Sequence, residues 1–142
     1  MIDIINLKYH SNMKKKNKIL ITGSTGFVGH NLKLELKKKY DVYGLGRKTK
    51  KEKKYFKINL KNKKKVLKLF KENKFDMIIH CAWYTNHEDY RNSKKNYEYL
   101  KISKFLLDAY IKNGGKNFIG LGTCEEYKKK QADLIADAQA NL

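Results

Sequence analysis

Proline is absent from the chain of 142 residues, and cysteine and arginine occur only twice each. The two cysteines, Cys81 and Cys124, are too few for a disulfide framework and fit no metal-ligand spacing, so we expect reduced thiols and no bound metal. No apolar run approaches the roughly 20 residues that span a bilayer. Residues 1–12 mix charged and apolar side chains, unlike a signal peptide. These absences predict a soluble cytoplasmic protein without a membrane partner.

Acidic residues are also scarce, since 14 Asp and Glu stand against 33 Lys and Arg, which gives a formal net charge of +19. Almost all of the basic residues are lysines, and they are spread along the whole chain. Nucleic-acid sites tend to gather arginine and aromatic side chains on one element, so this pattern favours solvated helix faces over a dedicated nucleic-acid site. The charge by itself could still give a general affinity for polyanions.

The chain length is that of one domain, too short for a cofactor domain plus a separate second domain of ordinary size. Residues 1–17 form a basic lead in which Met13 is an alternative start, and residues 18–127 carry the regular hydrophobic pattern. Residues 128–142 differ in composition, because the last eleven residues hold four alanines and no lysine, whereas the first 130 hold two alanines. This tail is either a natural helix or the product of a frame change or truncation.

Short apolar runs rich in β-branched or aromatic residues predict five strands, at residues 18–22, 41–45, 55–58, 77–80 and 118–121. Helical spacing predicts helices between them. One apolar face is formed by Val28, Leu32, Leu36 and Tyr40, a second by Val66, Leu67 and Phe70, and a third by Ile102, Phe105, Leu106 and Ala109. The third helix, over residues 93–113, should stop at Gly114. Alternating strands and helices predict an α/β fold with a doubly wound parallel sheet.

Three glycines, Gly23, Gly26 and Gly29, punctuate the segment between the first predicted strand and the first predicted helix. Gly23 can take a tight turn, Gly26 lets a pyrophosphate approach the backbone, and Gly29 lets the helix pack close to the strand. The free N–H groups and the dipole at the start of a helix favour an anion there. The segment is therefore either a dinucleotide-binding loop or a tight structural turn, and the strand and helix around it favour the first.

The spacing Thr-Gly-x-x-Gly-x-x-Gly over residues 22–29, with Phe27 and Val28, resembles the extended short-chain dehydrogenases/reductases and among them the NAD-dependent epimerase/dehydratase family. The resemblance implies a Rossmann-like fold and a bound NAD or NADP. It also implies a loop that holds the cofactor pyrophosphate, formed by Gly23, Thr25, Gly26, Phe27, Val28 and Gly29.

Further motifs extend the resemblance over residues 18–127. Asn59 and Leu60 stand where the family has an Asp and an apolar residue against the adenine, and residues 75–82 resemble a family strand that ends at Ala82, on the ribose side. Asn96 occupies the place of the Asn on the long helix. Residues 118–127 resemble the strand that leads to the catalytic Ser or Thr, here Thr123, which could instead cap the strand end.

Arg47 bears on the choice of cofactor. It lies 24 positions after Gly23, with Lys48 beside it. An acidic residue at about this distance would bind the ribose hydroxyls of NAD, whereas a basic residue would accommodate the 2′-phosphate of NADP. The sequence therefore favours NADP over NAD, although Arg47 could also be an ordinary surface cation of a lysine-rich loop.

The general acid/base of the resembled family is a tyrosine in a Tyr-x-x-x-Lys pair. Two such spacings occur, at Tyr90 with Lys94 and at Tyr97 with Lys101, but both precede the fifth predicted strand and are expected to be helix-surface pairs. In the family the pair follows the fifth strand, beyond the position of Leu142 here, so we expect little turnover by this chain alone.

Three aromatic residues follow or end the fourth predicted strand. Trp83 and Tyr84 could face the nicotinamide or substrate, or pack under another domain, because ligands bind at the carboxyl ends of strands in such sheets. His80 is expected to be a core histidine with its hydrogen bonds satisfied.

The resemblance implies the cofactor-binding part of an enzyme that moves a hydride between a nucleotide sugar and the nicotinamide, as an epimerase, dehydratase or reductase, and a homo-oligomer is possible. Two other readings stay open, a non-catalytic NADP-binding or interaction module whose fifth strand is an exposed edge, and a lysine-rich polyanion-binding protein.

Overall fold

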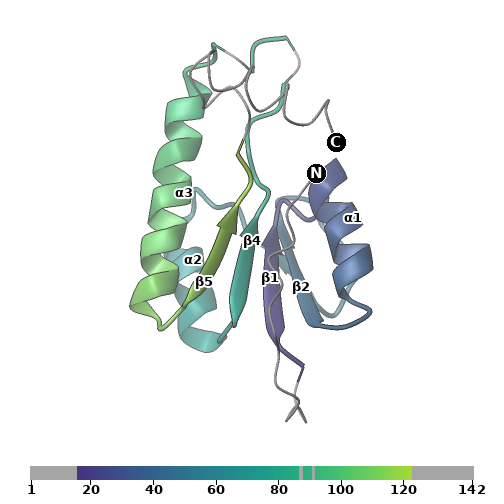
Figure 1. Cartoon of the computed structure of the whole chain (residues 1–142). Coiled ribbons are helices and arrows are strands. Elements are labelled where there is room, and N and C mark those ends of the chain that lie inside the picture. Colours follow the sequence, from purple (N-terminus) through teal and green to yellow (C-terminus); the bar gives the residue numbers. More distant parts are fainter. Residues whose placement is uncertain (1–15, 87, 91, 123–142) are drawn as a thin grey trace, which may run out of the picture.

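The computed structural model describes residues 16–86, 88–90 and 92–122, which form a parallel five-stranded sheet in the order β3-β2-β1-β4-β5 (Figure 1). The strands are β1 (Lys18–Thr22), β2 (Asp41–Gly46), β3 (Tyr55–Lys57), β4 (Met77–His80) and β5 (Asn117–Gly120). Helix α1 (Phe27–Leu36) lies on one face of the sheet, and α2 (Lys63–Glu72) and α3 (Lys95–Lys112) lie on the other. The predicted α/β, doubly wound architecture is confirmed.

Each face of the sheet carries its own apolar core, because successive side chains of a strand point to opposite faces. Leu20 of β1 belongs to the larger core beneath α2 and α3, whereas its neighbours Ile19 and Ile21 belong to the smaller core beneath α1. Both faces are covered at β1, which explains why this strand reads as a continuous apolar run.

The predicted strands agree with the structure to within one or two residues. The predicted face of α2 is partly wrong, because Leu67 is exposed and Leu69 is buried in its place. A helix turns by 3.6 residues, so Val66, Leu69 and Phe70 share one face, and Leu67 lies about a quarter turn away.

The predicted face of α1 is also incomplete, since Val28 in the first turn of the helix is exposed. Leu32 and Leu36 pack against the smaller core, and so does Tyr40, which follows the helix end. In α3, Leu106 and Ala109 are buried as expected. Gly114 takes a φ of 87° directly after this helix, a conformation that suits glycine and ends the helix.

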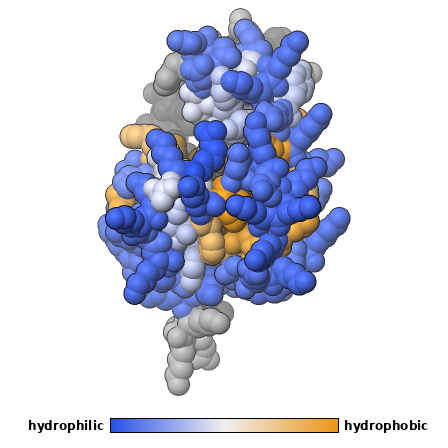
Figure 2. Space-filling model, turned by 180° about the vertical axis from the view of Figure 1, so that it is seen from behind, coloured by the Kyte–Doolittle hydropathy of each residue, from blue (hydrophilic) through white to orange (hydrophobic). Residues whose placement is uncertain are grey.

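Hydrophilic side chains cover most of the face seen in Figure 2, with an apolar area between them. Lysines lie on each of the three helices, in agreement with the expected solvated faces. No helix in the part of the chain that the structure describes is both long and apolar enough to cross a membrane.

Candidate functional site

The glycine loop between β1 and α1 approaches two other segments too closely for any side chain. Gly23 has a φ of 64°, and a Cβ placed on it would lie 2.8 Å from the backbone nitrogen of Ala82, just after β4. A Cβ on Gly29 would lie 2.4 Å from the carbonyl oxygen of Gly23. The loop therefore packs against the carboxyl end of β4 on one side and against the first turn of α1 on the other.

Helix α1 begins at this loop without a side-chain cap. The amide of Gly26 donates to the carbonyl of Gly23 at 2.9 Å, but within the described residues the amides of Phe27 and Val28 donate to no protein acceptor. The side chain of Phe27 is 88% exposed. Unpaired N–H groups at the positive end of a helix dipole attract anions, so this turn can hold the phosphates of a ligand.

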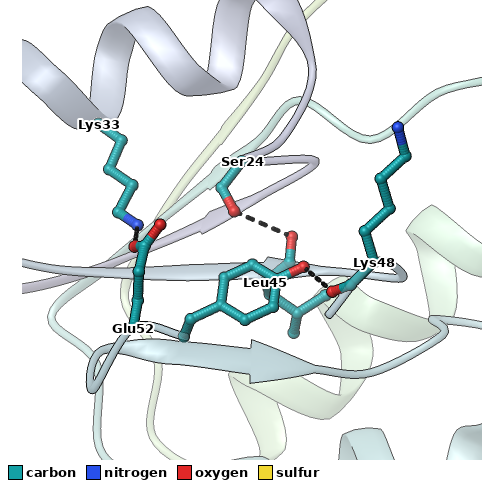
Figure 3. Close-up of polar contacts among 6 residues, drawn as sticks. Ser24, Lys33, Leu45, Lys48 and Glu52 are labelled. Carbon is teal, nitrogen blue, oxygen red and sulfur yellow. Dashed lines mark hydrogen bonds and ion pairs between the residues drawn. The ribbon is translucent and has the colours of Figure 1, made fainter. Parts of the chain in front are cut away.

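The loop also rests on the carboxyl end of β2. Ser24 is buried, and its amide and hydroxyl both donate to the carbonyl oxygen of Leu45, at 3.3 and 3.4 Å (Figure 3). Thr25 Oγ1 lies 3.5 Å from the point where a Cβ on Gly46 would be. Because Gly46 directly precedes Arg47, these contacts bring the loop and the turn that carries Arg47 together.

Arg47 and Lys48 are both exposed just beyond the end of β2. Among the described residues, neither side chain forms an ion pair or hydrogen bond. Glu52, the acid of the β2–β3 connection, forms an ion pair with Lys33 of α1, which lowers the pKa of this carboxyl mainly through the side-chain hydrogen bond (Figure 3). Two cations with no partner in the described part of the chain thus lie beside the glycine loop.

A buried hydrogen-bond network ties the end of β1 to β4 and α3. Thr22 Oγ1 lies 2.6 Å from His80 Nδ1, and His80 Nε2 lies 2.8 Å from Ser103 Oγ. Ser103 donates its proton to the carbonyl of Tyr99 at 2.8 Å, so it accepts from Nε2, and the Thr22 hydroxyl then donates to Nδ1. Burial lowers the pKa of His80 to about 4, which keeps the ring neutral. The expected core histidine is confirmed, whereas its partner Ser103 was not anticipated.

The other residues predicted to contact the cofactor lie in different surroundings. Asn59 is exposed two residues past β3, and its side-chain oxygen accepts from the amide of Lys61 at 3.1 Å. Leu60 is buried in the larger core, so it offers a ligand little side-chain surface. Ala82 is half-buried, and its amide donates to Thr22 Oγ1 at 3.4 Å. The loop residues, Arg47 and Ala82 are thus brought together, and Leu60 belongs to the core.

Trp83 and Tyr84 follow β4 and both pack against Tyr99 of α3, with ring centroids 6.0 and 6.2 Å apart. The Tyr84 hydroxyl donates to Asp89 at 2.7 Å, and Lys95 Nζ lies 3.3 Å from the same oxygen. Asn96 donates from Nδ2 to the carbonyl of Tyr90 at 2.6 Å, and its buried Oδ1 has no partner among the described residues. These groups lie near the first turn of α3. Trp83, Tyr84 and Asn96 were recognised in the sequence only as separate residues, and the contacts with Tyr99, Asp89 and Lys95 were not anticipated.

Thr123, the predicted catalytic residue, lies outside the described residues, as do Cys124 and Tyr127. Of the two Tyr-x-x-x-Lys spacings, Tyr97 and Lys101 are exposed on α3, as expected for a helix-surface pair. Tyr90 lies before α3 and Lys94 is the N-cap residue of that helix, so the expectation of a helix-surface pair is wrong for this spacing; the side chain of Tyr90 is 41% exposed.

The sheet order reverses between β1 and β4, and the glycine loop lies at the carboxyl end of β1 beside this switch point. A parallel sheet with such a loop at its switch point defines a dinucleotide-binding domain of the Rossmann type. Close backbone packing at Gly23 and Gly29 keeps this turn tight, and the unpaired amides of α1 fit a dinucleotide pyrophosphate. More narrowly, the chain belongs to the NAD dependent epimerase/dehydratase family, whose sequence model matches residues 19–141.

Solved structures of several sugar-nucleotide enzymes share the fold. The UDP-Glc/GlcNAc 4-epimerase of Campylobacter jejuni is 28% identical, with a TM-score of 0.63 over 73% of this chain and 36% of that chain. The UDP-N-acetylglucosamine 4-epimerase of Bacillus cereus is 21% identical, with a TM-score of 0.67 over 81% of this chain and 43% of that chain.

A third similar structure is the UDP-glucose 4-epimerase of Bifidobacterium longum in complex with NAD+ and UDP. It is 22% identical, with a TM-score of 0.66 over 75% of this chain and 37% of that chain. The matched part is therefore well under half of each of these three proteins. No curated protein matches the chain.

Proposed function

We propose that this chain provides the cofactor-binding part of an enzyme that modifies a nucleotide sugar. The observation that carries the proposal is the packing of the glycine loop, where Gly23 and Gly29 leave no room for a Cβ and the first amides of α1 remain unpaired. The family match and the similarity to the Campylobacter jejuni enzyme support the nucleotide-sugar substrate. The loop would bind the pyrophosphate, and Ala82 would line the ribose side.

A nicotinamide cofactor held by this loop would supply hydride transfer to or from a sugar carbon. The protein's part in this region is to hold and orient the dinucleotide. The hydrogen bonds of Thr22, His80 and Ser103 join β1, β4 and α3 next to the loop, because Thr22 directly precedes Gly23. The buried, neutral histidine would hold these three elements in place beneath the dinucleotide. Thr123 would orient the sugar hydroxyl or carbonyl.

For the cofactor we propose NADP in preference to NAD. The support is electrostatic, because Arg47 and Lys48 have no anionic partner among the described residues and Glu52 is neutralised by Lys33. A 2′-phosphate carries negative charge at neutral pH and would form charge-assisted hydrogen bonds with these cations. An acid that could bind the ribose hydroxyls of NAD is not free at this turn within the described chain.

Arg47→Asp tests this preference. Titration calorimetry of the full chain with NADP+ and with NAD+ should show that the change weakens NADP+ by roughly 10- to 100-fold, the loss expected for a charged hydrogen bond replaced by repulsion. Binding of NAD+ should change by less than about threefold. Equal weakening of both cofactors, or no change in either, would contradict the assignment.

A further inference from the structure

Tyr55, the first residue of β3, lies on the α1 face of the sheet opposite Gly44 of β2. Its hydroxyl donates to the carbonyl oxygen of Lys48 at 2.8 Å, the bond that the dashed line at Lys48 marks in Figure 3. We infer that Tyr55 is a positioning residue for cofactor choice, because this bond holds the turn that carries Arg47 and Lys48. The inference rests on the proposed NADP preference.

Two glycines of β2 make room for the Tyr55 side chain. A Cβ on Gly44 would lie 3.0 Å from Tyr55 Cδ2, and a Cβ on Gly46 would lie 2.7 Å from its hydroxyl oxygen. The two glycines are on the same face of β2, since residues two apart in a strand point the same way. The ring therefore runs along bare backbone toward the carboxyl end of the strand and reaches the turn that follows.

The turn has few other attachments. β2 ends at Gly46, and within the described residues the bond from Tyr55 to Lys48 is the one hydrogen bond made by residues 47–51. The connection to β3 contains no helix, and residues 47–51 are all exposed. Without the bond, the chain carrying Arg47 and Lys48 would sample more conformations, and ordering it around a phosphate would cost conformational entropy.

The phenol is suited to donate this bond continuously. Burial raises the pKa of Tyr55, with a smaller contribution from Glu52, so the hydroxyl keeps its proton at neutral pH. Lys33 Nζ lies 5.9 Å from the centre of the Tyr55 ring while it pairs with Glu52. The ring therefore contacts α1 as well as β2, and its hydrogen bond restrains the backbone at Lys48.

The test is Tyr55→Phe in the full chain, which removes only the hydroxyl. Calorimetry should show NADP+ binding weakened by about three- to tenfold, the effect of one lost hydrogen bond, with NAD+ binding changed by less than about twofold. Gly46→Ala, whose Cβ would displace the hydroxyl from 2.7 Å, should act in the same direction and serves if Tyr55→Phe does not fold.

Tyr43→Phe is the matched control. Tyr43 lies on the neighbouring strand β2, but it packs against the larger core on the opposite face, and its hydroxyl makes no hydrogen bond among the described residues. Its removal should leave the ratio of the two affinities unchanged. A change as large as that of Tyr55→Phe would overturn the inference, because the effect would then be general.

The outcomes separate the inference from the function on which it rests. If Arg47→Asp lowers the preference for NADP+ but Tyr55→Phe and Gly46→Ala leave it intact, the role of Tyr55 is wrong and the proposed cofactor stands. If the unmodified chain binds NAD+ as tightly as NADP+, the proposed cofactor is wrong and the inference is overturned with it. Loss of preference in both Tyr55→Phe and Gly46→Ala, with unchanged NAD+ affinity, supports it.

Discussion

At the residue scale, His80 shows how a buried polar side chain can be compatible with a core. Both ring nitrogens have partners, Thr22 Oγ1 and Ser103 Oγ, so a neutral ring leaves no polar atom unsatisfied. Desolvation by burial opposes the charge on the ring and lowers the pKa of His80 to about 4.

This histidine should make the stability of the chain depend on pH. Because the pKa of His80 is about 4 in the folded state and about 6.5 when unfolded, the unfolded state binds more protons below pH 6.5. The stability that depends on a neutral His80 is therefore fully present above pH 6.5 and is lost as the pH falls toward 4. We expect the free energy of unfolding in urea to fall by about 2 kcal/mol between pH 7 and pH 5.

His80→Gln is the control for that measurement, because it removes the titrating ring and keeps a hydrogen-bonding amide. The same fall in the variant between pH 7 and pH 5 would show that His80 does not titrate as described.

At the scale of the element, α2 shows that predicting a helix and predicting its buried residues are two different tasks. Its amino end is capped by Asn62, whose side-chain oxygen accepts from the amide of Lys65 at 3.0 Å. Its buried residues are Val66, Leu69 and Phe70, and the aromatic ring of Phe70 packs against Phe75 and Tyr110. The helix was predictable from its period, and the spacing of Val66, Leu69 and Phe70 also indicates the buried face, on which the prediction chose Leu67 in place of Leu69.

Two leucines of α2 offer a direct measurement of this orientation. Leu69→Ala should lower the free energy of unfolding by about 2–5 kcal/mol, since its side chain is 3% exposed and lies in the larger core. Leu67→Ala, the matched control on the same helix, should cost less than about 1 kcal/mol because Leu67 is 45% exposed. Urea unfolding of both variants measures the two losses of unfolding free energy, and equal losses would contradict the orientation of α2.

At the scale of the whole molecule, the charge of +19 opposes folding by self-repulsion. The described ion pairs do little against it, since Lys38 with Glu35 and Lys61 with Glu98 are exposed pairs of the kind that contribute about 0–1 kcal/mol. Repulsion among spread lysines acts over longer distances than these contacts, so dissolved salt should reduce it more than it weakens the pairs.

Thermal unfolding of the full chain should therefore respond to ionic strength. Raising NaCl from about 20 mM to 500 mM shortens the Debye length from roughly 20 Å to about 4 Å. If this relieves about 1 kcal/mol of repulsion, the Tm should rise by roughly 3–5 °C. Circular dichroism melts at the two salt concentrations measure the change, and a Tm that is constant or falls would mean that the ion pairs outweigh the repulsion.

Local features of the sequence determined much of the fold. The five strands, the three helices and the glycine loop follow from apolar period and from glycine spacing, which act over a few neighbouring residues and can be read directly from the chain. The resemblance of residues 22–29 to a family loop was confirmed by the family match. Arg47 and the three loop glycines were also recognised from their spacing in the sequence, although their roles in binding stay predictions.

Only the tertiary structure decided which distant residues meet. Ser103 reaches His80 across 23 positions, and Ser24 reaches Leu45 across 21. Tyr55 shows the same effect, since its reach to Lys48 depends on two glycines in a neighbouring strand. Such contacts are set by strand register and helix packing, and no local pattern encodes them.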